Sequence, residues 1–358
     1  MTPEEAPHGA LLEDAHTKTH KDTAMTAKLT FGYLYDFRNP PQWHRPWSHL
    51  YGEILDVIAW SEQVGFSEAW VPEHHLADDG YMPSPLIAMT AIAARTSKIR
   101  IGSGIALAPL HDPVRFATDC AVLDTFAGGR TDIGLAIGYR KRETAAFGID
   151  FTKRGKIFDE WLAIVSRLFA GETVDVAGEH FQISGAKLMP PPPGHIPLYI
   201  GGFADKSVER VLRYGDGYIG SEGVCDAYVA KMRERGQDPM SGRVKITGVT
   251  TVIADDPQAA LEELAPYYHH VNNSYGAWFS EDKVHSAEHA FRPMSLEDFK
   301  RSGTLQILTP DDAIAMLQRL QATMPLDHYL FSMPPGLPAD RFVHYAETIA
   351  NKVIPAFA

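Results

Sequence analysis

The chain has 358 residues, of which 45% are hydrophobic and 22% charged, so it can bury a large core and falls in the range of ordinary globular proteins. Lys and Arg number 33 against 45 Asp and Glu, and the formal charge of -12 repels a phosphate backbone, which argues against nucleic acid as a partner. No stretch approaches the roughly eighteen consecutive apolar residues that span a bilayer, and the first residues lack a basic region followed by an apolar one. We therefore expect a soluble cytoplasmic protein without a membrane partner.

Residues 1–27 are polar and show neither helical nor strand periodicity, so we expect a disordered or poorly ordered tail ahead of one domain spanning 28–358. From residue 29, strand-like and helix-like segments alternate. The predicted strands are 29–35, 67–71, 99–107, 132–137, 198–201, 217–220, 245–254 and 327–332. The predicted helices are 50–64, 85–95, 114–126, 158–170, 206–214, 226–235, 257–268, 310–321 and 339–353, with a polar β-like segment at 173–188.

This alternation requires a parallel sheet with right-handed crossovers. Eight units favour a closed (β/α)8 TIM barrel over an open doubly wound sheet, the competing architecture. Two connections, 39–49 and 272–304, exceed normal lengths and contain several aromatic residues. Because long loops in a compact domain often act as lids or binding loops, we expect both to lie over the same barrel mouth.

The triplet Glu73-His74-His75 follows the short predicted strand 67–71. Barrel enzymes keep their chemistry at the carboxyl ends of the strands, so the triplet is a candidate active-site edge, with a solvated loop as the alternative. Adjacent imidazoles on an extended segment point to opposite sides, unlike the histidines four residues apart of a zinc-binding helix. At most one of the two should face a given pocket, while the other bonds to backbone or solvent.

Cysteine spacing gives no second candidate site. Cys120 and Cys225 are the only cysteines and lack the paired spacing of a zinc or redox motif. We expect two buried thiols and no metal site, since a disulfide is improbable in a cytoplasmic chain.

Two glycine-containing segments are candidates for ligand contact. Gly201-Gly202 join a predicted strand to a predicted helix, where backbone amides and the helix start can bind a phosphate, although such pairs also form plain tight turns. Small residues within 101–105 weaken a strand unless a bulge or a flat ligand requires the room. If this segment binds a ligand, we expect a planar ring to lie against the backbone of 103–105, and Gly104 could accept an unusual peptide geometry.

Together these motifs resemble the luciferase-like flavin-dependent monooxygenase family, which includes the bacterial luciferase subunits and has deazaflavin-dependent relatives. The resemblance spans about Leu29 to Phe357, with the motifs in order. The residues on which the resemblance depends are 70–75, 101–104, 109, 112–115, 124, 128–130, 134–138, 147–148 and 197–202.

The resemblance implies that His74 is the catalytic imidazole beside the reactive edge of a flavin. It implies cofactor contacts from Glu73, Ser103, Gly104, Ile105, Ala136, Tyr139, Gly201, Gly202, Phe203, Ala204 and Ser207. Within this set, 103–105 would lie under the isoalloxazine, where the family tends to have a non-proline cis peptide, and the last four would hold the phosphate. Ala136 stands where luciferase has a reactive cysteine, which argues against assuming light emission.

We therefore expect a monooxygenase that uses reduced FMN and O2, through a flavin peroxide, to oxygenate a small apolar or aromatic substrate. Trp43, His44 and Trp278 are candidate substrate-pocket residues, although they could equally be packing residues. The resemblance implies that a separate reductase supplies the reduced flavin, and in keeping with this no Gly-x-Gly-x-x-Gly fingerprint follows a strand. The family also implies a homodimer. The alternatives are a deazaflavin (coenzyme F420)-dependent hydride-transfer enzyme and a flavin-binding protein without turnover.

Overall fold

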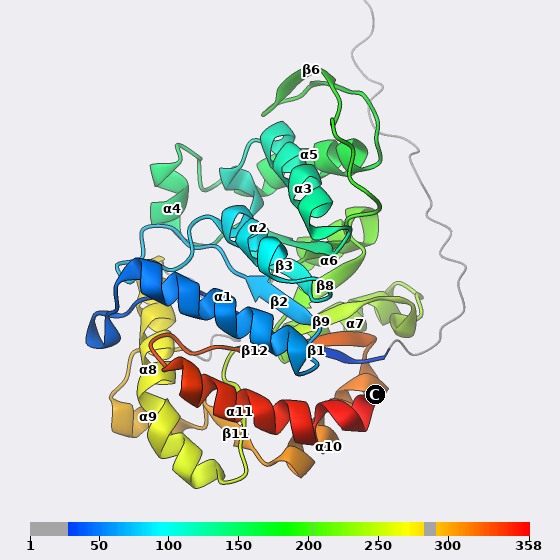
Figure 1. Cartoon of the computed structure of the whole chain (residues 1–358). Helices are drawn as coiled ribbons and strands as arrows, with labels where there is room; N and C mark the ends of the chain where they lie inside the picture. Colours follow the sequence, from blue (N-terminus) through cyan, green and yellow to red (C-terminus); the bar gives the residue numbers. More distant parts are fainter. Residues whose placement is uncertain (1–27, 203, 283–290) are drawn as a thin grey trace, which may run out of the picture.

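The computed structural model describes residues 28–202, 204–282 and 291–358, and its centre is a closed barrel of parallel strands surrounded by helices (Figure 1). The order around the barrel is β1-β2-β3-β4-β7-β8-β9-β12. These strands are Thr30–Leu34, Glu68–Val71, Arg100–Leu107, Thr131–Ala136, Leu198–Ile200, Gly217–Gly220, Val244–Gly248 and Leu326–Ser332. Each of the eight predicted strands contributes to the barrel, so the predicted (β/α)8 fold is confirmed. Residues 1–27 and Phe203 lie outside the described residues.

Helices follow the barrel strands and cover the outside of the barrel (Figure 1). They are α1 Trp47–Gln63, α2 Pro85–Arg95, α3 Pro113–Ala127, α4 Lys141–Ala146, α5 Arg154–Phe169, α6 Asp205–Tyr214, α7 Glu222–Glu234, α8 Pro257–Asp282, α9 Leu296–Ser302, α10 Pro310–Thr323 and α11 Ala339–Lys352. Local sequence sets their ends. In α3, for example, Asp112 caps the Arg115 N–H, Pro113 occupies the first turn, and Gly128 ends the helix with a φ of 63°. None of the described helices is long and apolar enough to cross a membrane.

One predicted strand is divided in the structure, and the predicted β-like segment is confirmed. The predicted strand 245–254 is divided by a turn at 249–250 into β9 and β10 (Thr251–Ile253), and β10 pairs with β11 (Gln306–Leu308) outside the barrel. An apolar run does not reveal that its two halves pack in different layers. The polar β-like segment 173–188 is confirmed as the antiparallel pair β5 (Val174–Ala177) and β6 (Gln182–Ala186).

The prediction of a long loop at 272–304 is wrong for much of its length. α8 continues from Pro257 to Asp282, past the internal Pro266, and α9 follows within the described part of 291–304. The helix continues because its inner face stays buried through Val271, Asn272 and Gly276. Trp43 of the first connection packs on Tyr267 of α8, with ring centroids 4.5 Å apart, but Tyr267 precedes 272–304, so this contact does not test the prediction that both connections lie over one barrel mouth.

Trp70 fills the interior of the barrel and explains the small residues of β3. Its ring packs with Leu34, Tyr199, Ile219 and Leu330. A Cβ on Gly102 would lie 2.3 Å from the ring atom Cδ2 of Trp70. The glycine at 102 therefore makes room for a protein side chain, and the bulge is also present, because the β3–β4 register shifts between Ser103 and Ala106.

Buried charges close the amino-terminal end of the barrel. We call Glu68, Asp132, Lys245 and His328 the floor cluster: Lys245 Nζ lies 3.4 Å from Asp132 and 3.7 Å from Glu68, and His328 lies 2.9 Å from Glu68. Burial alone would raise the pKa of Glu68, but Lys245 and His328 hold it at about 2. With this end filled, the carboxyl ends of the strands remain as the place for a ligand. Cys120 and Cys225 are buried free thiols, as predicted.

Candidate functional site

His74 and His75 follow β2 at the carboxyl end of the barrel, and their rings diverge. The buried His74 ring places Nδ1 3.0 Å from Glu143 Oε1, whereas His75 Nε2 lies 2.7 Å from Glu73 Oε1. The predicted divergence of the two imidazoles is confirmed. The partner of His75 is a carboxylate, not backbone or solvent as predicted.

Glu73 connects the ends of two strands. Its carboxylate accepts hydrogen bonds from the Leu107 N–H at 2.7 Å and lies 2.9 Å from His111 Nε2, in addition to its contact with His75. Burial would raise the pKa of Glu73, but the hydrogen bonds from His111, His75 and Leu107 lower it to about 2. The side chain is 0% exposed, so this ionised carboxylate faces protein groups, not the open part of the mouth.

Four aromatic rings surround His74, and we call these five residues the mouth cluster. The ring centroids of Tyr81, Tyr139, Tyr275 and Trp278 lie 4.8, 5.6, 5.8 and 5.2 Å from that of His74. Tyr81 follows β2, Tyr139 follows β4, and the other two lie on α8. The hydroxyls of Tyr81 and Tyr275 lie 2.8 Å apart. α8 is therefore the wall of the site opposite the strand ends.

Two buried arginines hold this wall. Arg140 Cζ lies 4.2 Å from the centroid of the Trp278 ring, and Arg38 Cζ lies 5.8 Å from the same ring. Arg38 also forms an ion pair of 2.6 Å with Asp79 and donates to Ser274 on α8 at 2.7 Å. Arg140 likewise forms an ion pair of 3.1 Å with Glu143. Both guanidinium groups thus combine a cation–π contact with an ion pair, which couples the strand ends to α8.

The accessible part of the mouth lies at the ends of β3, β4 and β7. Gly104, Ile105, Ala136, Tyr139 and Gly202 are partly exposed there. The Gly104–Ile105 peptide bond is cis, the geometry that the resemblance implied for this segment. A Cβ on Gly201 would lie 2.6 Å from Ile105 Cδ1, so the end of β7 packs directly on the cis segment.

Ser103 and Ser207 are both buried but differ in what their hydroxyls contact. Ser103 Oγ donates to the Gly134 carbonyl at 2.8 Å, so this hydroxyl bonds within the barrel wall. Ser207 lies in the first turn of α6, and a Cβ on Gly202 would lie 2.5 Å from its Oγ. Gly202 has a φ of +135°, which favours glycine. This turn and His74 both follow carboxyl ends of barrel strands, as predicted.

The three predicted substrate-pocket residues separate into two places. Trp278 belongs to the mouth cluster. Trp43 and His44 instead line an open hollow of about 470 Å³, together with Pro41, Gln42, Arg45, Gly336, Pro338 and Tyr267 of α8. The described structure does not bring this hollow into contact with His74.

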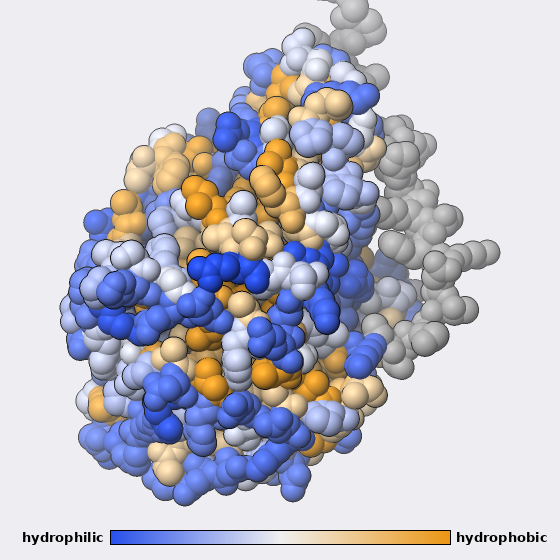
Figure 2. All heavy atoms as spheres, in the orientation of Figure 1, coloured by the Kyte–Doolittle hydropathy of each residue, from blue (hydrophilic) through white to orange (hydrophobic). Residues whose placement is uncertain are grey.

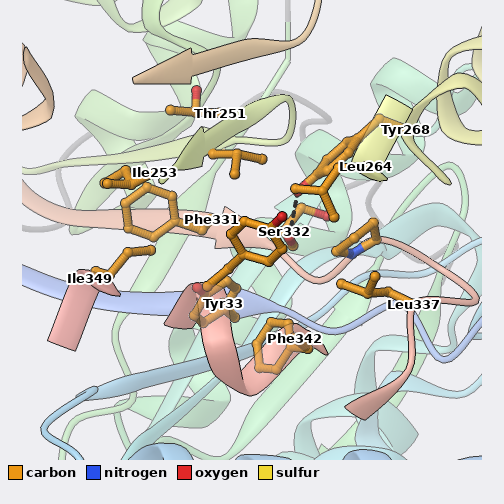
Figure 3. Close-up of a pocket in the computed structure, with 13 residues that line it drawn as sticks. Tyr33, Thr251, Ile253, Leu264, Tyr268, Phe331, Ser332, Leu337, Phe342 and Ile349 are labelled. Atoms are coloured by element: carbon orange, nitrogen blue, oxygen red, sulfur yellow. Dashed lines mark hydrogen bonds between the residues drawn. The ribbon is translucent and has the colours of Figure 1, made fainter. Parts of the chain in front are cut away.

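A second, small cavity of about 20 Å³ lies outside the barrel, between β12, α8 and α11 (Figure 3). Rings of Tyr33, Tyr268, Phe331 and Phe342 line it, and Tyr268 donates to the Ser332 carbonyl at 3.1 Å. None of the mouth cluster lines this cavity. It has room for about one water molecule and is a packing space.

Sequence reasoning missed Glu143, Arg38, Tyr81 and Tyr275. Glu143 lies among Arg and Lys residues, a pattern typical of a solvated helix face, yet its side chain is 1% exposed. Arg38 and Ser274 are 236 positions apart in the chain. The sequence does place Arg140 shortly after the predicted strand 132–137, and so near the barrel end where the site lies.

The sequence profile of the family described as luciferase-like monooxygenase matches residues 29–324. The chain is 25% identical over 331 residues to the oxygenase component of flavin-dependent trigonelline monooxygenase from Acinetobacter baylyi, a match covering 86% of this chain and 90% of that protein. It is 28% identical over 233 residues to F420-dependent glucose-6-phosphate dehydrogenase from Kineococcus radiotolerans, covering 59% and 67%.

The fold is similar to the crystal structure of the monooxygenase RslO1 from Streptomyces bottropensis. The TM-score is 0.78 at 20% identity, and the superposition covers 92% of this chain and 100% of that one.

Proposed function

Because the chain belongs to the luciferase-like monooxygenase family, a family of oxidoreductases, we propose that it oxygenates a small apolar or aromatic substrate with reduced FMN and O2. One observation carries this proposal: the His74 ring lies within an aromatic cluster at the same barrel end as the cis segment 104–105 and the Gly201-Gly202 turn. An imidazole, a flat accessible floor and an anion-accepting turn are the parts that a flavin enzyme needs.

The residues at the mouth fit a flavin. The partly exposed backbone of 104–105 with Ala136 offers a floor for the tricyclic ring, and Tyr139 offers an aromatic edge. The Gly201-Gly202 turn and the start of α6 offer backbone N–H groups for the phosphate, with Ala204 and Ser207 beside them. Glu73 and Ser103 act indirectly in this proposal, because their polar atoms are bonded within the protein.

When bound, reduced FMN supplies electrons for the activation of oxygen. His74 exchanges a proton with the reacting group, a task suited to an imidazole near neutral pH. Tyr275 and Trp278 on α8 keep bulk water from the reacting atoms, and the same rings present an apolar surface to the substrate. The aromatic character of this wall supports an apolar or aromatic substrate.

Two partner proteins belong to this proposal. A separate reductase supplies the reduced flavin, which is supported by the similarity to an oxygenase component. A second copy of the chain covers apolar side chains on α2 and α3, where Ile87 and Phe126 are 74% and 67% exposed. Figure 2 shows hydrophobic side chains gathered over these two helices, a feature that marks interaction surfaces.

The test compares two reduced cofactors. Purified protein is mixed anaerobically with reduced FMN or reduced F420, gel-filtered, and examined for retained chromophore; oxygen and a panel of small aromatic and terpenoid compounds are then added. We expect FMN to be retained and oxygenated product to form. The control reaction contains free reduced FMN, oxygen and the same compounds without the protein, and it must form no oxygenated product.

A deazaflavin-dependent hydride-transfer reaction is the second candidate, favoured by the 28% identity to an F420-dependent dehydrogenase. Both cofactors share a tricyclic ring and a phosphate, so the same floor and turn would serve. Retention of reduced F420 together with oxygen-independent turnover would replace the first proposal with this one. Retention of FMN without turnover on any compound would point to a flavin-binding protein without catalysis.

A further inference from the structure

Glu143 on α4 contacts His74, His75 and Arg140 through one oxygen atom of its carboxylate. Its Oε1 lies 3.0 Å from His74 Nδ1 and accepts the His75 backbone N–H at 2.8 Å and Arg140 Nη1 at 3.1 Å. The side chain is 1% exposed. Three groups therefore converge on an oxygen that water hardly reaches.

The charge of this carboxylate decides the direction of the His74 hydrogen bond. Burial alone would raise the pKa of Glu143, but contacts with His74, the His75 N–H and Arg140 hold it below its usual value. An ionised carboxylate only accepts hydrogen bonds. His74 Nδ1 must then be the donor, and a neutral imidazole has just one N–H.

The other ring nitrogen of His74 is left as an acceptor. Within the described part of the chain, Nε2 makes no hydrogen bond, and the ring is surrounded by the aromatic residues of the mouth cluster. The mouth cluster contains three tyrosine hydroxyls and the Trp278 N–H, but none of them bonds to this nitrogen among the described residues, and the hydroxyls of Tyr81 and Tyr275 bond to each other. The nitrogen is therefore available to a group bound in the mouth.

We propose that Glu143 is a positioning residue that fixes His74 in the Nδ1–H form and so presents Nε2 as a proton acceptor to the reacting group. The proposal rests on the proposed function for the identity of that group. Arg140 completes the arrangement, because its ion pair with Glu143 opposes transfer of a proton from His74 to the carboxylate. The general form of this arrangement, an imidazole oriented by a buried carboxylate, favours one tautomer over the other.

The direct test is 15N NMR of the full chain labelled at histidine, recorded without cofactor at about pH 8, with His74→Gln used to assign the His74 signals. We expect a protonated Nδ1 and an unprotonated Nε2. In Glu143→Gln the side-chain amide can donate to Nδ1, so we expect the tautomer to shift toward Nε2–H. A wild-type His74 with its proton on Nε2 would overturn the proposal, as would an unchanged tautomer in the variant.

A kinetic comparison distinguishes a positioning role of Glu143 from a purely structural role. Glu143→Gln should lower kcat about 10–100-fold while KM and reduced-flavin affinity stay unchanged. Glu143→Asp, which keeps the charge, should restore the Nδ1–H form and part of kcat. The matched control is Glu62→Gln, because Glu62 also accepts backbone N–H groups, from Ser97, Lys98 and Ile99, but lies on α1 away from the mouth. If Glu143→Gln lost flavin affinity and kcat to the same extent, the role of Glu143 would be structural and the positioning role would be refuted.

The two proposals can fail separately. The NMR measurement needs no turnover, so a chain that fails to oxygenate any compound can still show the expected tautomer. If Glu143→Gln does not fold, the wild-type spectrum alone decides which nitrogen carries the proton.

Discussion

Replacing Lys245 by methionine tests whether the floor cluster is held together by charge. Its Nζ is 0% exposed and lies 3.4 Å from Asp132 and 3.7 Å from Glu68. It also lies 4.8 and 4.4 Å from the ring centroids of Trp70 and Tyr199. Methionine keeps much of the apolar stem but leaves two buried carboxylates with less compensation. Breaking a buried pair in this way costs about 3–5 kcal/mol of folding free energy.

That loss corresponds to a fall in Tm of about 4–7 °C, taking about 2.1 cal/mol/K per residue for the entropy of unfolding. Scanning calorimetry and urea unfolding measure it. Asp132 keeps Arg100, which is always charged, whereas Glu68 keeps His328, which is charged only when protonated, so most of the cost should fall on Glu68. The double variant Lys245→Met/Glu68→Gln should therefore recover part of the loss.

The control for Lys245 is an exposed ion pair of the same kind. Lys352 lies 2.7 Å from Asp255 with its side chain 50% exposed, and Lys352→Met should change stability by less than about 1 kcal/mol. A Lys245→Met protein within about 0.5 kcal/mol of wild type would refute the reasoning. So would a double variant that loses as much as the sum of the two single variants.

Three further predictions address the site and the barrel. His74→Ala should bind reduced FMN normally but form product about 10²–10⁴-fold more slowly; unchanged coupled turnover would remove His74 from the mechanism. Gly102→Ala, whose Cβ would lie 2.3 Å from the Trp70 ring, should lose about 1–3 kcal/mol in urea unfolding, and an unaffected midpoint would contradict this packing. Burial would raise the pKa of Asp79, but His270 and Arg38 hold it at about 2, below its ordinary 3.8. Its stabilising contribution is therefore present above about pH 4 and lost as the pH falls to 2, and Asp79→Asn should flatten that part of the stability–pH curve.

The fold could be predicted because periodic patterns repeat along the chain. Eight apolar segments alternating with helical segments leave few topologies other than a parallel barrel, and each of those segments contributes a barrel strand. The pattern failed where local sequence does not determine structure. The run 245–254 has uniform β character, so the turn at 249–250 was hidden. The helix predicted to end at Tyr268 continues to Asp282, because tertiary contacts along its inner face outweigh a weak local signal.

The site was predictable only in part, and the reason is the range of its contacts. The positions of His74 and of the Gly201-Gly202 turn follow from strand ends, which the sequence marks. The role of Trp70 in requiring Gly102 does not, since the two residues lie on neighbouring strands and only the register brings them together. Glu143 was missed because charged helical residues are usually solvated, and burial of a carboxylate is decided by partners elsewhere in the chain.

The two ends of the barrel use buried charges for different tasks. At the floor, Lys245 serves two carboxylates and the cluster is closed on itself, which stabilises the barrel without presenting any group to a ligand. At the mouth, Arg140 and Arg38 neutralise Glu143 and Asp79 and also pack against Trp278. The charges of Glu143 and Asp79 are thus balanced within the protein, so under the proposed function a substrate need not neutralise either ion, and we expect the aromatic rings to select it. This balance is the physical reason to expect an uncharged apolar or aromatic substrate at this site.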